Sequence, residues 1–152
     1  MTELVSRQEF EVSVDFYHFG LQESDDADLP VPYPDEMDLD DGWLVKSWPG
    51  RIDFRSAGHT HTAKATVEVW DGAPPEDADT WDVVEDTTLT TTSGNLAFWD
   101  MGRSENEVTL GSGGTWQVRV ASSGRRLVSD LTELGEDADG VEQYLIQFWR
   151  KN

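Results

Sequence analysis

The sequence contains no cysteine, only three lysines, and no apolar run approaching the ~20 residues that a membrane-spanning helix needs. Without cysteine there is no disulfide framework, no thiol nucleophile and no thiolate metal site. The first residues also lack a basic stretch followed by an apolar one, which is the pattern of a secretory signal peptide. We therefore expect a cytoplasmic protein.

Positive charge is scarce as well, because 11 Lys and Arg stand against 31 Asp and Glu, giving a formal net charge of −20. Nucleic acids and anionic membranes are bound by basic surfaces, so we expect neither as a partner. Seven Trp, six Phe and three Tyr supply the bulky apolar side chains that disordered acidic chains lack. A length of 152 residues predicts one folded domain over residues 1–152.

Apolar and polar residues alternate along much of the chain, which is typical of half-buried β-strands. The clearest alternation covers residues 10–16, 63–69, 116–120 and 144–148. Turn sequences such as Ser93-Gly94-Asn95 separate the strands, and the connections are too short for regular parallel crossovers. The pattern predicts an all-β protein, either a barrel or an antiparallel β-sandwich, jelly-roll-like, of about eight strands, and we favour the sandwich.

Two local features refine this expectation. The apolar phase changes after Phe16, so that Tyr17, Phe19 and Leu21 carry the apolar face, and this predicts a β-bulge near Phe16–Tyr17. At most one short helix is expected, either around Ser129–Leu134 or in the acidic stretch that ends at Gly42.

The acidic residues are concentrated outside the clearest strands, with 20 of the 31 in three segments. The largest segment, residues 23–41, holds nine acidic residues and three prolines and predicts one long acidic loop. The other two cover residues 76–86 and 133–142. We call residues 23–41 the acidic segment.

The His59-Thr60-His61 sequence is the weak candidate for a metal site. Alternate residues of a strand point to the same face, so the two imidazoles could bind one metal ion, and a plain pair of surface histidines is the alternative. The acidic loops around Gly42 and Gly140 do not have the ligand spacing of an EF-hand, although an irregular Ca²⁺ site remains an alternative. We expect no cofactor.

The sequence also lacks catalytic motifs. There is no G-x-S-x-G nucleophile elbow and no phosphate-binding P-loop. Paired carboxylates hydrolyse glycosides in some β-sandwiches, but with 31 acidic residues the spacing selects no pair. We expect a protein that is not an enzyme and has no catalytic residues.

Tryptophan is unusually frequent for a domain of this size. Trp116 lies in phase with the apolar positions of its strand, which places it in the core. Trp70, Trp99 and Trp149 are out of phase with theirs, which places them on the second sheet face or at strand ends. An exposed indole can stack on a sugar or fill a pocket of a protein partner.

Two segments carry a resemblance to a known family: the first strand reads F-E-V-S-V-D-F-Y-H-F-G-L, and the chain closes with Y-L-I-Q-F-W. In length, in strand order and in the aromatic-His-Phe segment, the chain resembles the bacterial competence-protein J family over most of its length. The founding member of that family is a DNA-entry nuclease inhibitor. The resemblance implies inhibition of a nuclease by protein–protein contact, with no catalytic residues to carry over. The long acidic segment and the larger charge depart from the family pattern.

Charge and resemblance together suggest a non-catalytic acidic binding protein that neutralises a basic partner, a nuclease or a toxin. An acidic surface with aromatic anchors could occupy a cationic cleft as a phosphate mimic, and long-range attraction would speed association at low salt. The candidate contacts lie in and just after the acidic segment: Asp25, Asp26, Asp28, Asp35, Glu36, Asp38, Asp40, Asp41, Trp43 and Trp48.

Two alternatives stay open at this point. The chain could be a β-sandwich module that binds a carbohydrate or another small ligand through exposed tryptophans. The acidity could also reflect an acid-biased proteome, in which case it serves solubility and does not report a partner.

Overall fold

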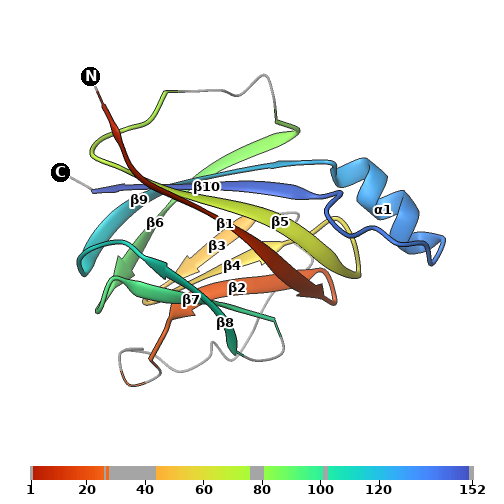
Figure 1. The fold of residues 1–152 in the computed structure, drawn as a ribbon, viewed down its shortest axis with the longest axis horizontal. Helices are drawn as coiled ribbons and strands as arrows, with labels where there is room; N and C mark the ends of the chain where they lie inside the picture. The colour runs from red at the N-terminus through yellow and green to blue at the C-terminus, as the bar shows by residue number, and fades with distance from the viewer. Residues whose placement is uncertain (1, 26, 28–43, 76–80, 101–102, 151–152) are drawn as a thin grey trace.

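The computed structural model describes residues 2–25, 27, 44–75, 81–100 and 103–150. Ten strands and one helix follow one another along the chain, and all ten strands belong to one hydrogen-bonded sheet (Figure 1). The elements are β1 (Leu4–Asp15), β2 (His18–Glu23), β3 (Val45–Trp48), β4 (Arg51–Arg55), β5 (Thr60–Trp70), β6 (Val83–Thr91), β7 (Asn95–Trp99), β8 (Arg103–Thr109), β9 (Gly114–Ser123), α1 (Arg125–Glu133) and β10 (Gln143–Arg150).

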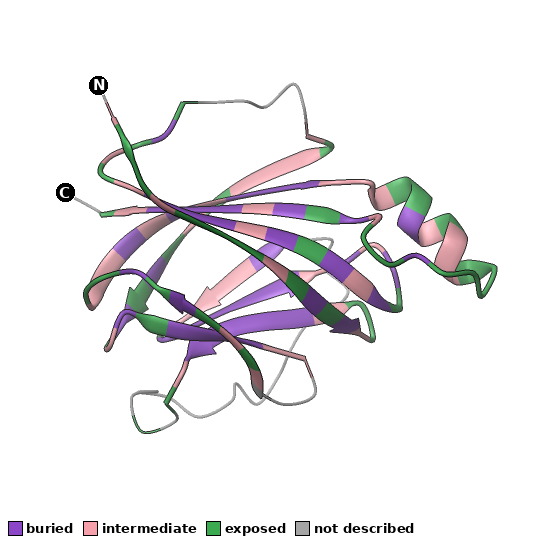
Figure 2. Cartoon of the chain, viewed as in Figure 1, coloured by how far each residue is buried: buried purple, intermediate pink, exposed green. Residues whose placement is uncertain are grey.

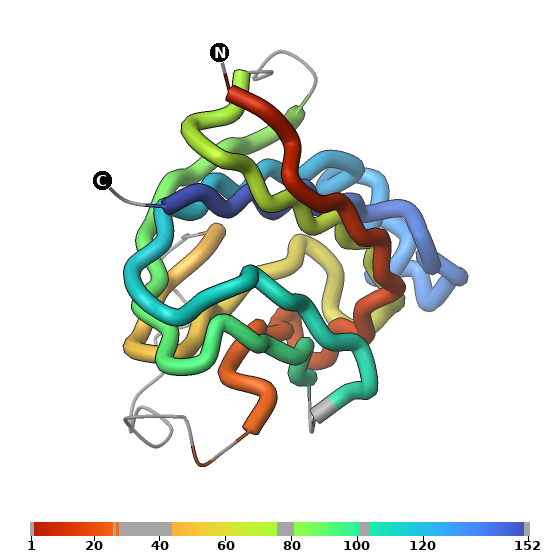
Figure 3. The backbone as a smooth tube through the Cα atoms, turned by 60° about the vertical axis from the view of Figure 1, so that its left-hand side comes forward, coloured from red at the N-terminus to blue at the C-terminus, as the bar shows by residue number. Residues whose placement is uncertain are grey.

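The sheet curls into a nearly closed barrel. Its strand order is β3-β4-β2-β1-β5-β10-β9-β6, and β7 branches off by pairing with β2 and with β8. Hydrogen bonds join the two ends of this path: the N–H of Leu44, just before β3, donates to Glu85 Oε2 of β6 at 2.9 Å, and the Ser47 and Thr87 hydroxyls lie 2.9 Å apart. Figure 3 shows the backbone wrapped in this way around the interior.

The sheet is mixed, because β10 pairs parallel with β5 and antiparallel with β9. The prediction of a β-rich chain with one short helix is therefore confirmed, whereas the expectation of purely antiparallel strands is wrong at this pair. The favoured jelly-roll-like sandwich is not confirmed either, because all ten strands of the described residues belong to one barrel-like sheet and do not form two packed sheets. The antiparallel expectation rested on short connections, which restrict only strands that follow one another directly. β5 and β10 are separated by four other strands and the helix, so their parallel pairing needs no single crossover.

The core follows the predicted alternation, as the banded colouring of β5 and β10 in Figure 2 shows. Inward-facing aromatic rings pack at its centre: Phe19 stacks on Phe54 with centroids 4.7 Å apart, and Tyr144 meets Phe19 edge-on at 5.0 Å. Burying one such ring contributes about 1.5–3 kcal/mol to folding. Trp116 is 3% exposed, which confirms its predicted place in the core.

The change of apolar phase in the first strand has a different cause from the predicted bulge. Asp15 pairs with His18 across a two-residue turn, and the strand ends there. Phe16 (φ 53°) and Tyr17 (φ 65°) both adopt the left-handed conformation that such a tight hairpin requires. β1 and β2 are therefore separate strands, and the phase changes because the chain reverses direction.

The helix lies at one end of the barrel (Figure 1) and begins four residues before the predicted start at Ser129. Its one buried residue is Val128. The alternative helix before Gly42 falls on residues outside the described ranges. No helix in the described part of the chain combines the length and the apolar character needed to cross a membrane.

Candidate interaction surfaces

Of the ten predicted partner contacts, Asp25 and Trp48 belong to the described residues. Asp25 is exposed and accepts a hydrogen bond from the Ala27 N–H at 2.9 Å. The other eight lie outside the described ranges: Asp26, Asp28, Asp35, Glu36, Asp38, Asp40, Asp41 and Trp43. Their contact with a partner stays a prediction, but the structure does show how the barrel holds the residues on either side of them.

Glu23, at the end of β2, fixes the start of the acidic segment. Its side chain is fully buried, and each carboxylate oxygen accepts hydrogen bonds. Oε2 accepts from the Thr91 hydroxyl at 2.8 Å and from the Thr92 N–H at 2.6 Å, and Oε1 accepts from the Ser93 hydroxyl at 2.6 Å. The Glu23 N–H donates to the Gly50 carbonyl at 3.0 Å. The end of β2 is therefore tied to the β6–β7 turn and to the β3–β4 turn.

Trp48, at the end of β3, is held by a second buried carboxylate. Its indole N–H donates to Asp53 Oδ2 at 2.9 Å, while Asp53 Oδ1 lies 2.7 Å from Arg51 Nε and 2.9 Å from His18 Nε2. Asp53 is 1% exposed and Trp48 is half-buried. A partner could therefore contact the exposed part of the Trp48 ring, but the indole N–H already donates to Asp53.

His59 and His61 differ in burial, so they form neither the two same-facing imidazoles of the weak metal-site candidate nor the alternative pair of surface histidines. His59 precedes β5 and is exposed, whereas His61 is in β5 with a side chain 1% exposed. The strand begins only at Thr60, so the alternation rule does not extend back to His59. Within the described residues, no three His, Asp or Glu side chains come together in a way that could hold a metal ion.

The His61 ring belongs to a buried polar cluster that the sequence did not reveal. Ser56 Oγ lies 2.8 Å from His61 Nε2 and donates to Glu142 Oε1 at 2.7 Å, and Glu142 Oε2 accepts from the Ala57 N–H at 2.8 Å. Arg125 of α1 reaches the same oxygen at 3.4 Å. The hydroxyl stands between the imidazole and the carboxylate, whereas a hydrolytic triad has the imidazole in the middle.

This cluster is also closed to substrates, because Ser56 is 2% exposed and Glu142 is 0% exposed. It joins the β4–β5 connection, the helix and the start of β10. Its arrangement is that of an internal brace.

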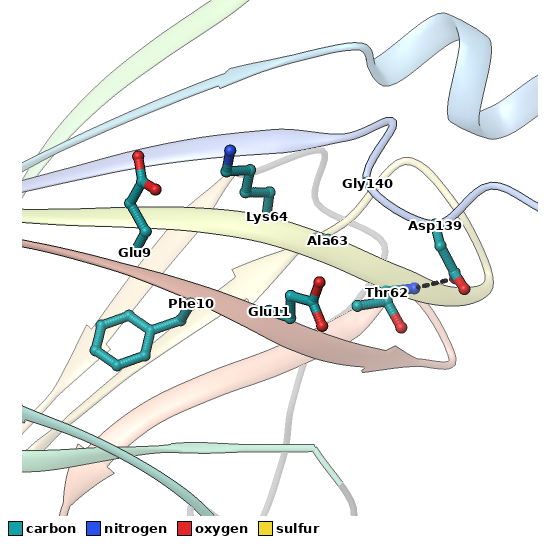
Figure 4. A pocket seen from close by; sticks show the side chains of 8 residues that line it. All are labelled: Glu9, Phe10, Glu11, Thr62, Ala63, Lys64, Asp139 and Gly140. Atoms are coloured by element: carbon teal, nitrogen blue, oxygen red, sulfur yellow. Dashed lines mark hydrogen bonds between the residues drawn. The ribbon is translucent and has the colours of Figure 1, made fainter.

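The outer face of β1, β5 and β10 carries two neighbouring hollows of about 440 and 500 Å³ that share Glu9 and Lys64. Figure 4 shows the first, where Glu9 and Phe10 leave opposite sides of β1. At its end the Thr62 N–H donates to the Asp139 carboxylate at 3.1 Å. Phe10 faces inward, where its ring centroid is 5.3 Å from that of Phe98.

Trp70 and Trp81 line the second hollow, together with Pro75. A polar network orients Trp70: its indole N–H donates to Glu68 Oε1 at 3.0 Å, and Gln147 Nε2 donates to the same oxygen at 3.0 Å. Trp70, Trp99 and Trp149 are all half-buried residues at strand ends, as their sequence phase predicts. The hollow thus combines two indoles, of which Trp70 is held by a hydrogen bond, with polar side chains.

Together these features define the class of protein: a nearly closed, mixed β-barrel braced by buried carboxylates, with its aromatic and charged side chains available at strand ends and on the outer face. No protein-family model matches the sequence, and no curated protein is significantly similar to it.

Two solved structures share this fold over the whole chain. One is ComJ of Bacillus subtilis, an inhibitor of the DNA-degrading activity of NucA; it is 14% identical, 99% of each chain is covered, and the TM-score is 0.64. The other is the product of crocagin biosynthetic gene J, also 14% identical, with 100% of this chain and 99% of that chain covered and a TM-score of 0.65. The predicted resemblance to the competence-protein J family is thereby confirmed at the level of the fold.

Proposed function

We propose that this protein is a non-catalytic binding protein that inhibits a DNA-degrading nuclease by protein–protein contact. The observation that supports it most is the whole-chain likeness to ComJ, an inhibitor of the DNA-degrading activity of NucA. The burial of the Ser56, His61 and Glu142 cluster supports it too, because the hydroxyl, imidazole and carboxylate that come together there serve the fold.

We propose that the partner is a basic nuclease and that this acidic protein occupies its cationic cleft in place of DNA. A net charge of −20 would attract a cationic cleft over a long range and raise the association rate at low salt. Glu23 fixes the end of β2 just before the proposed contacts, and Asp53 fixes the indole of Trp48, the last of them, so a partner would meet these residues on a rigid part of the barrel.

The test is a DNA-degradation assay with purified NucA and with purified nucleases encoded by the genome that encodes this protein. We expect stoichiometric inhibition of at least one of them, weakening as salt rises. The variant Asp40→Asn with Asp41→Asn should weaken inhibition, whereas the matched change Glu11→Gln with Glu105→Gln, at exposed positions on β1 and β8, should leave it unchanged. Failure to inhibit any nuclease of the panel contradicts the proposal.

A second candidate function, binding of an oligosaccharide, is favoured by the hollow beside Trp70 and Trp81. Sugar rings stack on indole faces, and the fixed polar groups of Glu68 and Gln147 lie next to them. A glycan array probed with the purified protein tests it. Binding should be lost in Trp81→Ala, a variant that should still inhibit a nuclease, and the absence of binding to any glycan would argue against this function.

A further inference from the structure

The turn between β1 and β2 exposes two large aromatic side chains. Phe16 is 61% exposed and Tyr17 is 41% exposed, although both are among the residue types that usually help to form a core. Their rings do not contribute to the central aromatic packing; each makes an edge contact with the ring of the exposed His59 at a centroid distance of 5.1 Å. Burial of apolar surface therefore does not explain why aromatic residues occupy this turn.

The backbone of the turn is also unfavourable for these residue types. Both Phe16 and Tyr17 have positive φ, and a turn with two such residues is normally formed by Asn-Gly, Asp-Gly or Gly-Gly. Bulky side chains such as those of Phe and Tyr disfavour this left-handed conformation. Strain of this kind is found at functional sites, where the surrounding structure maintains it.

Hydrogen bonds from neighbouring segments hold the strained backbone of this turn in place. The Tyr17 N–H donates to the His59 carbonyl at 2.9 Å, and the Tyr17 carbonyl accepts from the Ser56 N–H at 2.8 Å. Ser56 is itself part of the buried cluster with Glu142. The aromatic rings are thus presented on a rigid turn, so a partner that bound them would not have to order a flexible loop.

Two carboxyl groups lie close together next to this turn: Asp15, which directly precedes Phe16, and Asp100. Interaction with the Asp100 side chain, burial and the negative charge of Asp100 raise the pKa of Asp15. The nearby His59 acts in the opposite direction. A cationic group placed between the two carboxylates would remove their repulsion, so the turn offers an apolar surface next to a position suited to a positive charge.

We propose that this turn is an anchor of the nuclease contact: Phe16 and Tyr17 bind an apolar patch on the partner, and Asp15 and Asp100 pair with an arginine or lysine beside that patch. The inference rests on the proposed function. The turn and Glu23 lie at opposite ends of β2, and six residue steps of about 3.3 Å place Tyr17 ~20 Å from Glu23. An interface of ordinary size, about 800 Å² on each partner, can cover both the turn and the start of the acidic segment.

The experiment replaces the turn by the sequence that its backbone prefers, Phe16→Asn with Tyr17→Gly, and measures both Tm and nuclease inhibition with the same panel. Because the new residues suit positive φ, Tm should be unchanged or higher. The concentration needed for half-inhibition should rise at least ten-fold, as expected for loss of an aromatic hot spot. Asp15→Asn with Asp100→Asn should also weaken inhibition and reduce its dependence on salt.

The matched control is Val5→Thr, which changes another exposed apolar side chain of β1 at the opposite end of the strand and should alter inhibition less than two-fold. If the unmodified protein inhibits no nuclease, the proposed function fails and the anchor fails with it. If it inhibits but the Asn-Gly variant inhibits equally well, the anchor alone is wrong. A lower Tm of the Asn-Gly variant would show that the aromatic residues serve the fold, and would also overturn the inference.

Discussion

Replacing Glu23 by glutamine tests how strongly a buried carboxylate braces the base of the acidic segment. The side chain is 0% exposed, and its partners at the β6–β7 turn all donate: two hydroxyls and the N–H groups of Thr92 and Ser93. Glutamine has the same size but offers one acceptor oxygen and one donor group. The glutamine amide can therefore accept hydrogen bonds at the position of only one of the two carboxylate oxygens.

The expected loss of unfolding free energy depends on which hydrogen bonds glutamine can still form at this position. With its oxygen facing Thr91 and Thr92, glutamine keeps those bonds and can donate to the Ser93 hydroxyl, but it loses the charge and the 3.3 Å contact with the Ser93 N–H. Hydrogen bonds to a charged group contribute ~1.5–3 kcal/mol, so Glu23→Gln should lower the free energy of unfolding by about 2 kcal/mol. Glu23→Ala, which removes all the acceptors, should lower it by about 4 kcal/mol.

Urea unfolding at neutral pH measures both values, with Glu11→Gln as the control of equal charge change. Glu11 is exposed on β1, and its substitution should change the free energy of unfolding by no more than about 0.5 kcal/mol. A Glu23→Gln protein as stable as Glu11→Gln would show that the buried carboxylate does not stabilise the end of β2.

Three further predictions concern the other buried or paired groups. Ser56→Ala should lower the free energy of unfolding by about 2 kcal/mol, because Glu142 loses a buried donor; urea unfolding equal to that of the unmodified protein would contradict this. Burial raises the pKa of Tyr144 well above 10.0, so the unfolded chain ionises first, and stability should fall as pH rises above 10.0. Tyr144→Phe should lessen that alkaline loss in a pH series of thermal melts, and an unchanged series would count against it. The raised pKa of Asp15 makes its charged form unfavourable beside Asp100, so stability is lost as pH rises from 3.8 through the folded pKa. Asp15→Asn should therefore melt higher than the unmodified protein at neutral pH, with the difference vanishing below pH 3.8; a lower Tm at neutral pH would be inconsistent with repulsion.

The regular part of the fold could be predicted from the sequence because it depends on alternation. Residues 63–69 and 144–148 form strands as expected, and Trp116 is buried as its phase indicates. Helix α1 overlaps its predicted position. These features follow from local patterning, which is the information that a single sequence carries most directly.

The parts that could not be predicted depend on contacts between distant residues. The parallel pairing of β5 with β10 joins strands far apart in the chain, and no local pattern specifies it. The Phe16–Tyr17 turn lacks the Asn-Gly signal of a tight hairpin, so the change of phase resembled a bulge. Tertiary hydrogen bonds compensate for the unfavourable local sequence there.

The candidate sites were predictable to a smaller extent. Glu23, Asp53 and Glu142 are buried braces, but among 31 acidic residues nothing in their sequence context distinguishes them from surface acids. The proximity of Ser56 and His61 arises from the connection before β5, whose path the sequence did not define. The predicted contacts of the acidic segment stay predictions.

We propose that this β-barrel inhibits a nuclease by direct contact. The most direct measurement is the rate of DNA degradation by purified NucA, and by nucleases from the genome that encodes the protein, as this chain is added in increasing amounts. We expect at least one nuclease to lose activity at a fixed molar ratio, and the loss to weaken as salt rises. DNA degradation that continues undiminished with every nuclease, at low and at high salt, would contradict it.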